Sequence, residues 1–103
     1  MMTIQMSYHA HTERADRLAA CIEYIGVGHV VYEVANYRRD REAVTRVTST
    51  GLVLIMNKNT NTVITGYAAT PKQIAGIYQG KAPQSLYNRV KKNYEKFRFL
   101  YEI

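Results

Sequence analysis

The sequence predicts an α+β domain, in which an N-terminal helix packs on a four-stranded antiparallel sheet that is followed by C-terminal helices. Two patterns lead to this class. Apolar residues recur every three or four positions near both ends of the chain, and segments rich in Val, Ile, Thr and Tyr fill the middle. The 103 residues suffice for one hydrophobic core, so we expect a single domain over residues 1–103.

The first element is a helix over about residues 7–24. Its apolar residues recur at helical spacing, with no proline among them, at Ala15, Leu18, Ile22 and Ile25. Gly26 and Gly28 come next and are expected to end it. Cys21 falls near the apolar side, so we expect it in the core.

Four β-type segments follow, over about residues 29–37, 43–50, 52–58 and 62–69. The joints between them are polar, and Asn59 and Asn61 lie in the last one. Because Asn tolerates the left-handed backbone that tight turns need, this joint favours a hairpin. Gly51 is a candidate bend. Together the segments predict an antiparallel meander.

Two helices are expected after the sheet. Thr70 suits an N-cap, Pro71 the first helical position and Gln73 the capping-box position, so a short helix begins there and ends near Gly80. A second helix begins near Ser85, and its predicted buried stripe is Leu86, Val90, Tyr94 and Phe97. The apolar terminal segment should dock on the core as a strand or as an extension of this helix.

Positive charge is concentrated in the C-terminal part of the chain. Residues 1–42 carry five Arg or Lys against six Asp or Glu, whereas residues 43–103 carry nine against two. Such asymmetry favours a polyanionic partner, and RNA fits best; a basic face that serves only solubility is the alternative. The candidate nucleic-acid contacts are Arg17, Lys72, Arg89, Lys91, Lys92 and Lys96.

Several classes of protein are not supported. The longest apolar run, Leu52 to Met56, is five residues, too short to span a membrane. A single cysteine and the absence of a signal-peptide pattern favour the cytoplasm. The three His, one Cys and dispersed acids show no metal-ligand spacing, and no glycine-rich loop could hold a nucleotide, so we expect neither metal nor cofactor.

Five polar residues could carry catalysis. On a helical wheel His11 and Arg14 fall on the apolar side of the first helix, near its N-terminal end, where they could line a cleft. Thr65 and Tyr67 are two apart on one strand and share a face, and Arg46 heads a polar row on another strand. The alternatives are that His11 packs at the core margin with Arg14 paired to a carboxylate, and that Thr and Tyr are ordinary strand formers.

These groups would suit cleavage of RNA without a metal. A His can move a proton on or off the 2′-hydroxyl or the leaving oxygen, Arg can stabilise charge on the phosphorane, and Thr or Tyr can donate to a phosphate oxygen. The 2′-hydroxyl supplies the nucleophile, so this chemistry applies to RNA and not to DNA.

The run from Val47 to Asn57, followed by Thr62-Val-Ile-Thr-Gly-Tyr67, resembles the sheet of the barnase, EndoU, colicin and RelE-like ribonuclease group, particularly its phage and contact-dependent toxin members. The resemblance covers about residues 8–70. It implies a metal-independent endoribonuclease whose cleft would gather His11, Arg14 or Arg46, Thr65 and Tyr67. EndoU-like members use two His and a Lys, and only His29 could be the second His here.

The leading hypothesis is therefore a toxin-like endoribonuclease, with an antitoxin or host protein as a further partner. The alternative is a non-catalytic phage or mobile-element protein that binds nucleic acid or a host protein through its basic surface. A structural protein of a virion is a third class. The sequence leaves the oligomeric state open.

Overall fold

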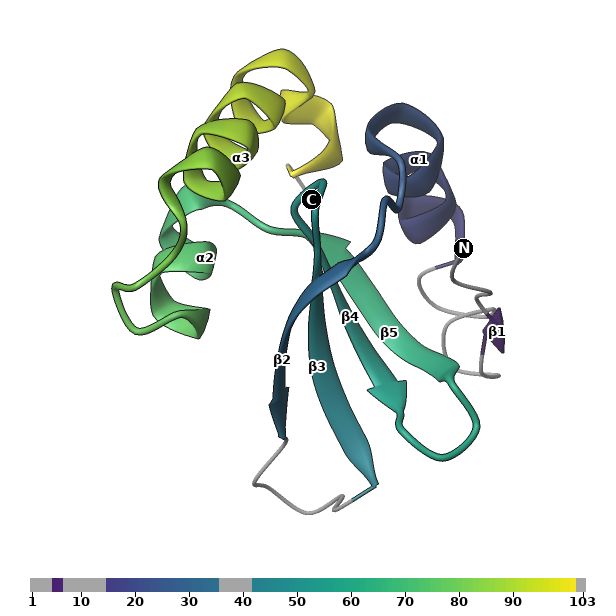
Figure 1. Cartoon of the computed structure of the whole chain (residues 1–103). Coiled ribbons are helices and arrows are strands. Elements are labelled where there is room, and N and C mark those ends of the chain that lie inside the picture. Colours follow the sequence, from purple (N-terminus) through teal and green to yellow (C-terminus); the bar gives the residue numbers. More distant parts are fainter. Residues whose placement is uncertain (1–4, 7–14, 36–41, 102–103) are drawn as a thin grey trace.

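The computed structural model describes residues 5–6, 15–35 and 42–101, and within them the chain forms the predicted α+β arrangement (Figure 1). Its elements are β1 (Gln5–Met6), α1 (Ala15–Ile25), β2 (Val30–Ala35), β3 (Ala43–Thr48), β4 (Leu52–Asn57), β5 (Thr62–Ala68), α2 (Pro71–Ile77), α3 (Gln84–Lys96) and a 3-10 helix (Arg98–Leu100). No helix in this described part is long and apolar enough to cross a membrane.

The sheet has the strand order β1-β5-β4-β3-β2. Strands β2 to β5 form the predicted antiparallel meander, in which Val47 pairs with Val53 and Val53 with Tyr67. The parallel pairing of β1 with β5 was not predicted, because two residues are too short to show a period. Within the described residues, β2 therefore forms the edge of the sheet opposite β1.

Each face of the sheet is covered by helices (Figure 1). Side chains alternate along a strand, so Val44 and Leu54 point to one face, where Leu18 of α1 packs on them. Val47 and Val53 point to the other face and pack against α2 and α3. The core therefore has two layers, one on each side of the meander.

Hydrogen bonds around the β3–β4 turn, residues 48–51, join distant parts of the chain. The Thr50 hydroxyl donates to the Gly26 carbonyl at 2.5 Å, so the Thr48 hydroxyl, 2.9 Å away, must donate to Thr50. The backbone N–H of Leu52 in turn donates to Thr48 Oγ1 at 3.0 Å. Asn93 Nδ2 of α3 donates to the Thr50 carbonyl at 2.8 Å. The turn therefore connects the residue after α1 to the C-terminal part of α3.

Helix α2 begins as the sequence predicts. The Gln73 N–H donates to the Thr70 hydroxyl at 3.2 Å, and the Thr70 N–H donates to the Gln73 side chain at 2.9 Å, which completes the capping box. Pro71 occupies the first turn, where its missing N–H costs no hydrogen bond. Gly80, at φ +80°, closes the helical segment where it was expected.

The remaining helices agree with the predictions in part. Helix α1 ends before Gly26, and Cys21 is buried, as predicted; residues 7–14 of the expected first helix lie outside the described part. Leu86 and Val90 of α3 are buried as predicted, whereas the buried Asn93 was missed. The terminal segment docks through the 3-10 helix, whose Leu100 enters the core beside α1.

Substitution of Gly51 by Ala should destabilise the fold strongly. Gly51 has φ +94°, and an added Cβ would lie 2.7 Å from Cγ2 of Val90, so strain and overlap act together. We expect urea denaturation to show a loss of about 2–3 kcal/mol. Gly26→Ala is the matched control, because its φ is +85° but nothing lies within 4 Å of the new Cβ; it should lose only about 1 kcal/mol. Equal losses would contradict the steric account.

Alkaline pH should weaken the fold through Tyr101. Burial, with a smaller contribution from Cys21, raises the pKa of Tyr101 to about 12. The folded state therefore holds this proton after the unfolded chain has lost it, and the free energy of unfolding falls as pH rises from about 10 to about 12. Urea denaturation across this range should show a shallower fall in Tyr101→Phe than in the wild type; an unchanged slope would rule Tyr101 out as a contributor.

Candidate functional site

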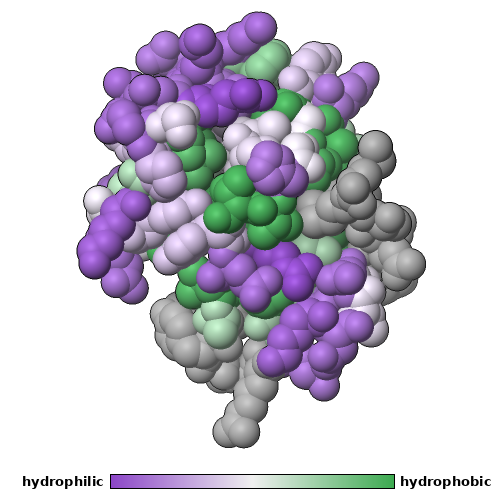
Figure 2. All heavy atoms as spheres, viewed as in Figure 1, coloured by the Kyte–Doolittle hydropathy of each residue, from purple (hydrophilic) through white to green (hydrophobic). Residues whose placement is uncertain are grey.

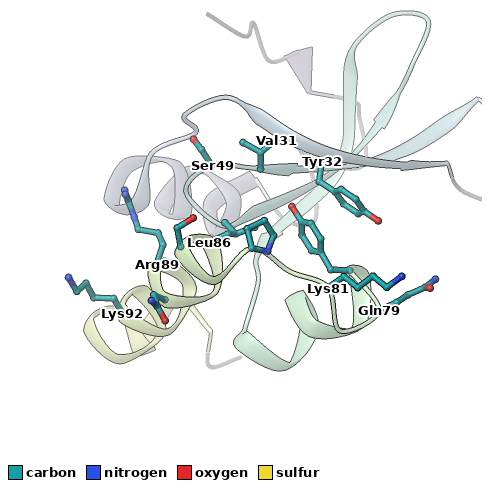
Figure 3. Close-up of a pocket in the computed structure, with 12 residues that line it drawn as sticks. Val31, Tyr32, Ser49, Gln79, Lys81, Leu86, Arg89 and Lys92 are labelled. Atoms are coloured by element: carbon teal, nitrogen blue, oxygen red, sulfur yellow. The ribbon is translucent and has the colours of Figure 1, made fainter.

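A cavity of about 890 Å³ opens between the edge strand β2, the β3–β4 turn and the two C-terminal helices (Figure 3). Val31 and Tyr32 of β2 form one wall, and Leu86 of α3 lies across from them. Ser49 of the turn and Tyr78 at the end of α2 also line it. We call this cavity, with its cationic residues Lys81, Arg89 and Lys92, the basic groove.

An irregularity in β2 explains how two successive residues of a strand reach the same cavity. The pairing with β3 shifts between Val30 and Tyr32, so Val31 has no partner of its own in the register. A bulge of this kind redirects side chains beside a functional surface. Val31 is 44% exposed.

Two tyrosines stack at the wall of the basic groove, the partly exposed Tyr32 on the buried Tyr78. The rings of Tyr32 and Tyr78 stack with centroids 3.9 Å apart and planes inclined by 22°. Burial raises the pKa of Tyr78, and the adjacent Tyr32 raises it further. The Tyr78 hydroxyl is therefore neutral at physiological pH and places no negative charge against an anionic ligand.

The Tyr78 hydroxyl is also buried without a hydrogen-bond partner among the described residues. A buried polar group in this state lowers stability, so its presence calls for an explanation beyond packing. Tyr78 lines the basic groove, but its hydroxyl oxygen is covered by protein and does not open into the groove.

The charge of the basic groove is entirely positive in the described residues. Lys81 comes from the loop between α2 and α3, and Arg89 and Lys92 are three residues apart on one side of α3 (Figure 3). No Asp or Glu lines the groove, and the described part of the chain gives these three cations no ion pair. Figure 2 shows hydrophilic side chains gathered over α3. Such a site attracts anions.

Thr65 and Tyr67, two of the predicted catalytic residues, share a face of β5 as expected. Tyr67 packs on the layer beneath α2 and α3, and burial raises the pKa of its hydroxyl. The Thr65 hydroxyl is buried and, like that of Tyr78, has no partner among the described residues. Neither residue lines the basic groove.

Arg46 lies on the opposite face, and this corrects the expectation that it joins Thr65 and Tyr67. Arg46 pairs in register with Leu54, which pairs with Gly66, so all three point toward α1. Its guanidinium is held there by Glu33, with Nε and Oε1 2.8 Å apart, and by Asn61 Oδ1 at 2.8 Å from Nη1.

The other predicted catalytic residues, His11 and Arg14, lie outside the described part of the chain. His29, the other His considered, is exposed, and its backbone N–H donates to Ser49 Oγ at 3.1 Å. Within the described residues, no three His, Cys, Asp or Glu gather where they could hold a metal ion. The described geometry therefore does not assemble the expected catalytic set.

The predicted nucleic-acid contacts divide into two groups. Arg89 and Lys92 line the basic groove, whereas the others do not: Lys72, Lys91 and Lys96 are exposed elsewhere, and Arg17 is half-buried on α1. Sequence reasoning missed Lys81, Tyr32 and Tyr78. The available signals were the position of Lys81 just after a predicted helix end and the nine Tyr of the chain, whose rings could stack on bases.

No protein-family model matches the chain, and neither does any curated protein or solved structure.

Replacing Tyr78 by Phe should stabilise the ligand-free protein. The change removes a buried hydroxyl that has no partner and keeps the stacked ring, so the free energy of unfolding should rise by about 1 kcal/mol. Tyr32→Phe is the control, because the Tyr32 hydroxyl is not among the buried groups that lack a partner, and little change is expected. A loss of stability in Tyr78→Phe, measured by urea denaturation, would mean that the hydroxyl is already paired.

Proposed function

We propose that this protein binds single-stranded RNA in the basic groove. The observation that carries the proposal is the combination of a stacked tyrosine pair with three cations and no lining acid. Proteins that hold single strands combine these two features, since cations contact the phosphates and aromatic rings stack on the bases. The volume of about 890 Å³ lies in the range of small-ligand sites, enough for a base with its sugar and phosphate.

A single strand fits this groove better than a duplex does. Stacking on Tyr32 requires a base that has left its own stack, and bases are available in this form in loops and single strands. The cavity is also bounded on two sides, by β2 and by α3. A duplex would contact only the cations on the rim of the basic groove.

Polar uncharged groups favour RNA over DNA. Ser49 Oγ accepts a hydrogen bond from the His29 N–H, so its own proton remains available to a ligand. Gln79 and Asn88 line the same groove. Hydroxyl and amide groups of this kind can pair with the 2′-hydroxyl, which distinguishes RNA from DNA at a given site. An RNA partner and the free, buried Cys21 both fit the cytoplasm.

The proposal is limited to binding. Cleavage through the 2′-hydroxyl, which the resemblance to ribonuclease toxins implies, stays a prediction because His11 and Arg14 lie outside the described residues and Arg46 faces away from Thr65 and Tyr67. The two activities are separable by experiment.

Binding should depend on Lys92 and not on its neighbour Lys91. Both are exposed lysines on α3, but only Lys92 lines the basic groove, so they form a matched pair. For a labelled RNA of about ten nucleotides, fluorescence anisotropy should show that Lys92→Ala weakens binding roughly three- to tenfold and flattens the logarithmic salt dependence by about 0.7. Lys91→Ala should change neither quantity much. Equal effects of the two would indicate attraction to net charge alone.

Cleavage has its own test. If the ribonuclease resemblance holds, wild-type protein should cut labelled RNA in EDTA, and His11→Ala should slow the reaction by roughly 10²–10⁴-fold, the contribution typical of a general acid or base. Gel electrophoresis of the RNA provides the readout, and circular dichroism checks that the variant folds. RNA left intact by concentrated wild-type protein that nevertheless binds it would refute cleavage and leave the binding proposal in place.

A further inference from the structure

The described residues expose three large hydrophobic side chains, and two of them form a second aromatic surface. Val31 is in the basic groove, whereas Tyr24 and Phe99 are 52% and 56% exposed at the far end of α3. Phe97, which is half-buried, contacts both. The ring centroids are 5.1 Å apart for Tyr24 and Phe99, 5.7 Å for Tyr24 and Phe97, and 6.3 Å for Phe97 and Phe99. We call these three rings the aromatic patch.

The aromatic patch is held in place by the fold. Tyr24 belongs to the last turn of α1, and Phe97 and Phe99 lie at the end of α3 and in the 3-10 helix that follows. Leu100, between Phe99 and the half-buried Tyr101, is buried beside α1. Two of the rings meet edge to face with Phe99 at interplanar angles of 84° and 86°, the geometry that aromatic pairs prefer. The exposed rings are therefore preorganised.

A line of cations joins the basic groove to the aromatic patch. Arg89, Lys92 and Lys96 follow one another at spacings of three and four residues, so they lie along one side of α3. Arg89 and Lys92 line the groove, and Lys96 Nζ lies 5.3 Å from the centroid of the Phe97 ring. Lys96 lies seven residues after Arg89, which corresponds to about 10 Å along the helix.

We propose that a single strand of RNA held in the basic groove continues along these cations and stacks its next bases on the aromatic patch. This inference rests on the proposed function and extends it by giving the strand a path and a second stacking surface. Phosphates would follow Arg89, Lys92 and Lys96, while bases stack on the tyrosine pair at one end and on Phe99 or Tyr24 at the other. The expected site covers about four to six nucleotides.

The charge around the patch favours RNA over a second copy of the chain. Protein interfaces exclude charged groups from their apolar centre, and lysine is depleted there. Here Lys96 lies against the Phe97 ring. In a symmetric dimer through the patch, the Lys96 ammonium groups of the two copies would approach each other.

The test compares RNA lengths with two variants of one exposed residue. Phe99→Leu keeps an apolar side chain but removes the ring, and Phe99→Tyr keeps the ring. With an RNA of about eight nucleotides, Phe99→Leu should weaken binding roughly five- to tenfold, and Phe99→Tyr should bind like the wild type. With an RNA of about three nucleotides, which the groove alone can hold, all three proteins should bind equally. Circular dichroism verifies that each variant is folded.

The outcomes separate this inference from the proposed function. If the longer RNA binds in a Lys92-dependent way but Phe99→Leu has no effect, the path is wrong and the groove proposal stands. The same holds if Phe99→Leu weakens both lengths equally. If neither RNA binds the wild type, both proposals fail. A dimer of the wild type in sedimentation experiments that Phe99→Leu dissociates would assign the patch to self-association and overturn the inference.

Discussion

The rest of the structure depends on the hydrogen bonds of the β3–β4 turn. Thr50 donates from its hydroxyl to the carbonyl of Gly26, at the end of α1, and accepts at its own carbonyl from Asn93 of α3. These helices cover opposite faces of the sheet, and the β3–β4 turn is hydrogen-bonded to both sides. Gly51 then accepts the N–H of Ala69 at 3.0 Å, which fixes where the chain leaves β5 toward α2. A buried polar network of this type specifies one arrangement because any other leaves groups unpaired.

The same turn sets the shape of the basic groove. Its Ser49 lines the groove and accepts the N–H of His29, which precedes β2, so one wall is held from the turn. The bond from Asn93 fixes α3 and with it the opposite wall, which carries Arg89 and Lys92. The basic groove therefore lies between β2 and α3, and both walls are hydrogen-bonded to the β3–β4 turn. Because the groove is preformed, binding of a ligand requires little loss of conformational entropy in the protein.

Local signals predicted the fold well, and long-range contacts explain what was missed. Thr70 and Gln73 are three residues apart, and their capping box followed from sequence alone. The alternation of side chains within β3 and within β5 was predicted correctly. Whether Arg46 and Thr65 lie on the same face of the sheet depends on the register between the strands, and the sequence of one strand does not reveal that register. The stack of Tyr32 on Tyr78 joins residues that are distant in sequence, and its existence depends on how α2 docks.

The composition suggested one broad basic surface. In the structure, some of the cations line the basic groove and others are exposed elsewhere on the protein. The cations of the basic groove lie beside the stacked pair of Tyr32 and Tyr78. The Tyr78 hydroxyl stays neutral because burial raises its pKa. Charge alone attracts every polyanion equally, and salt weakens that attraction. Stacking adds a requirement for a free base, which a duplex does not meet. A site built from both therefore discriminates by strandedness first, and it can do so without reading any base sequence.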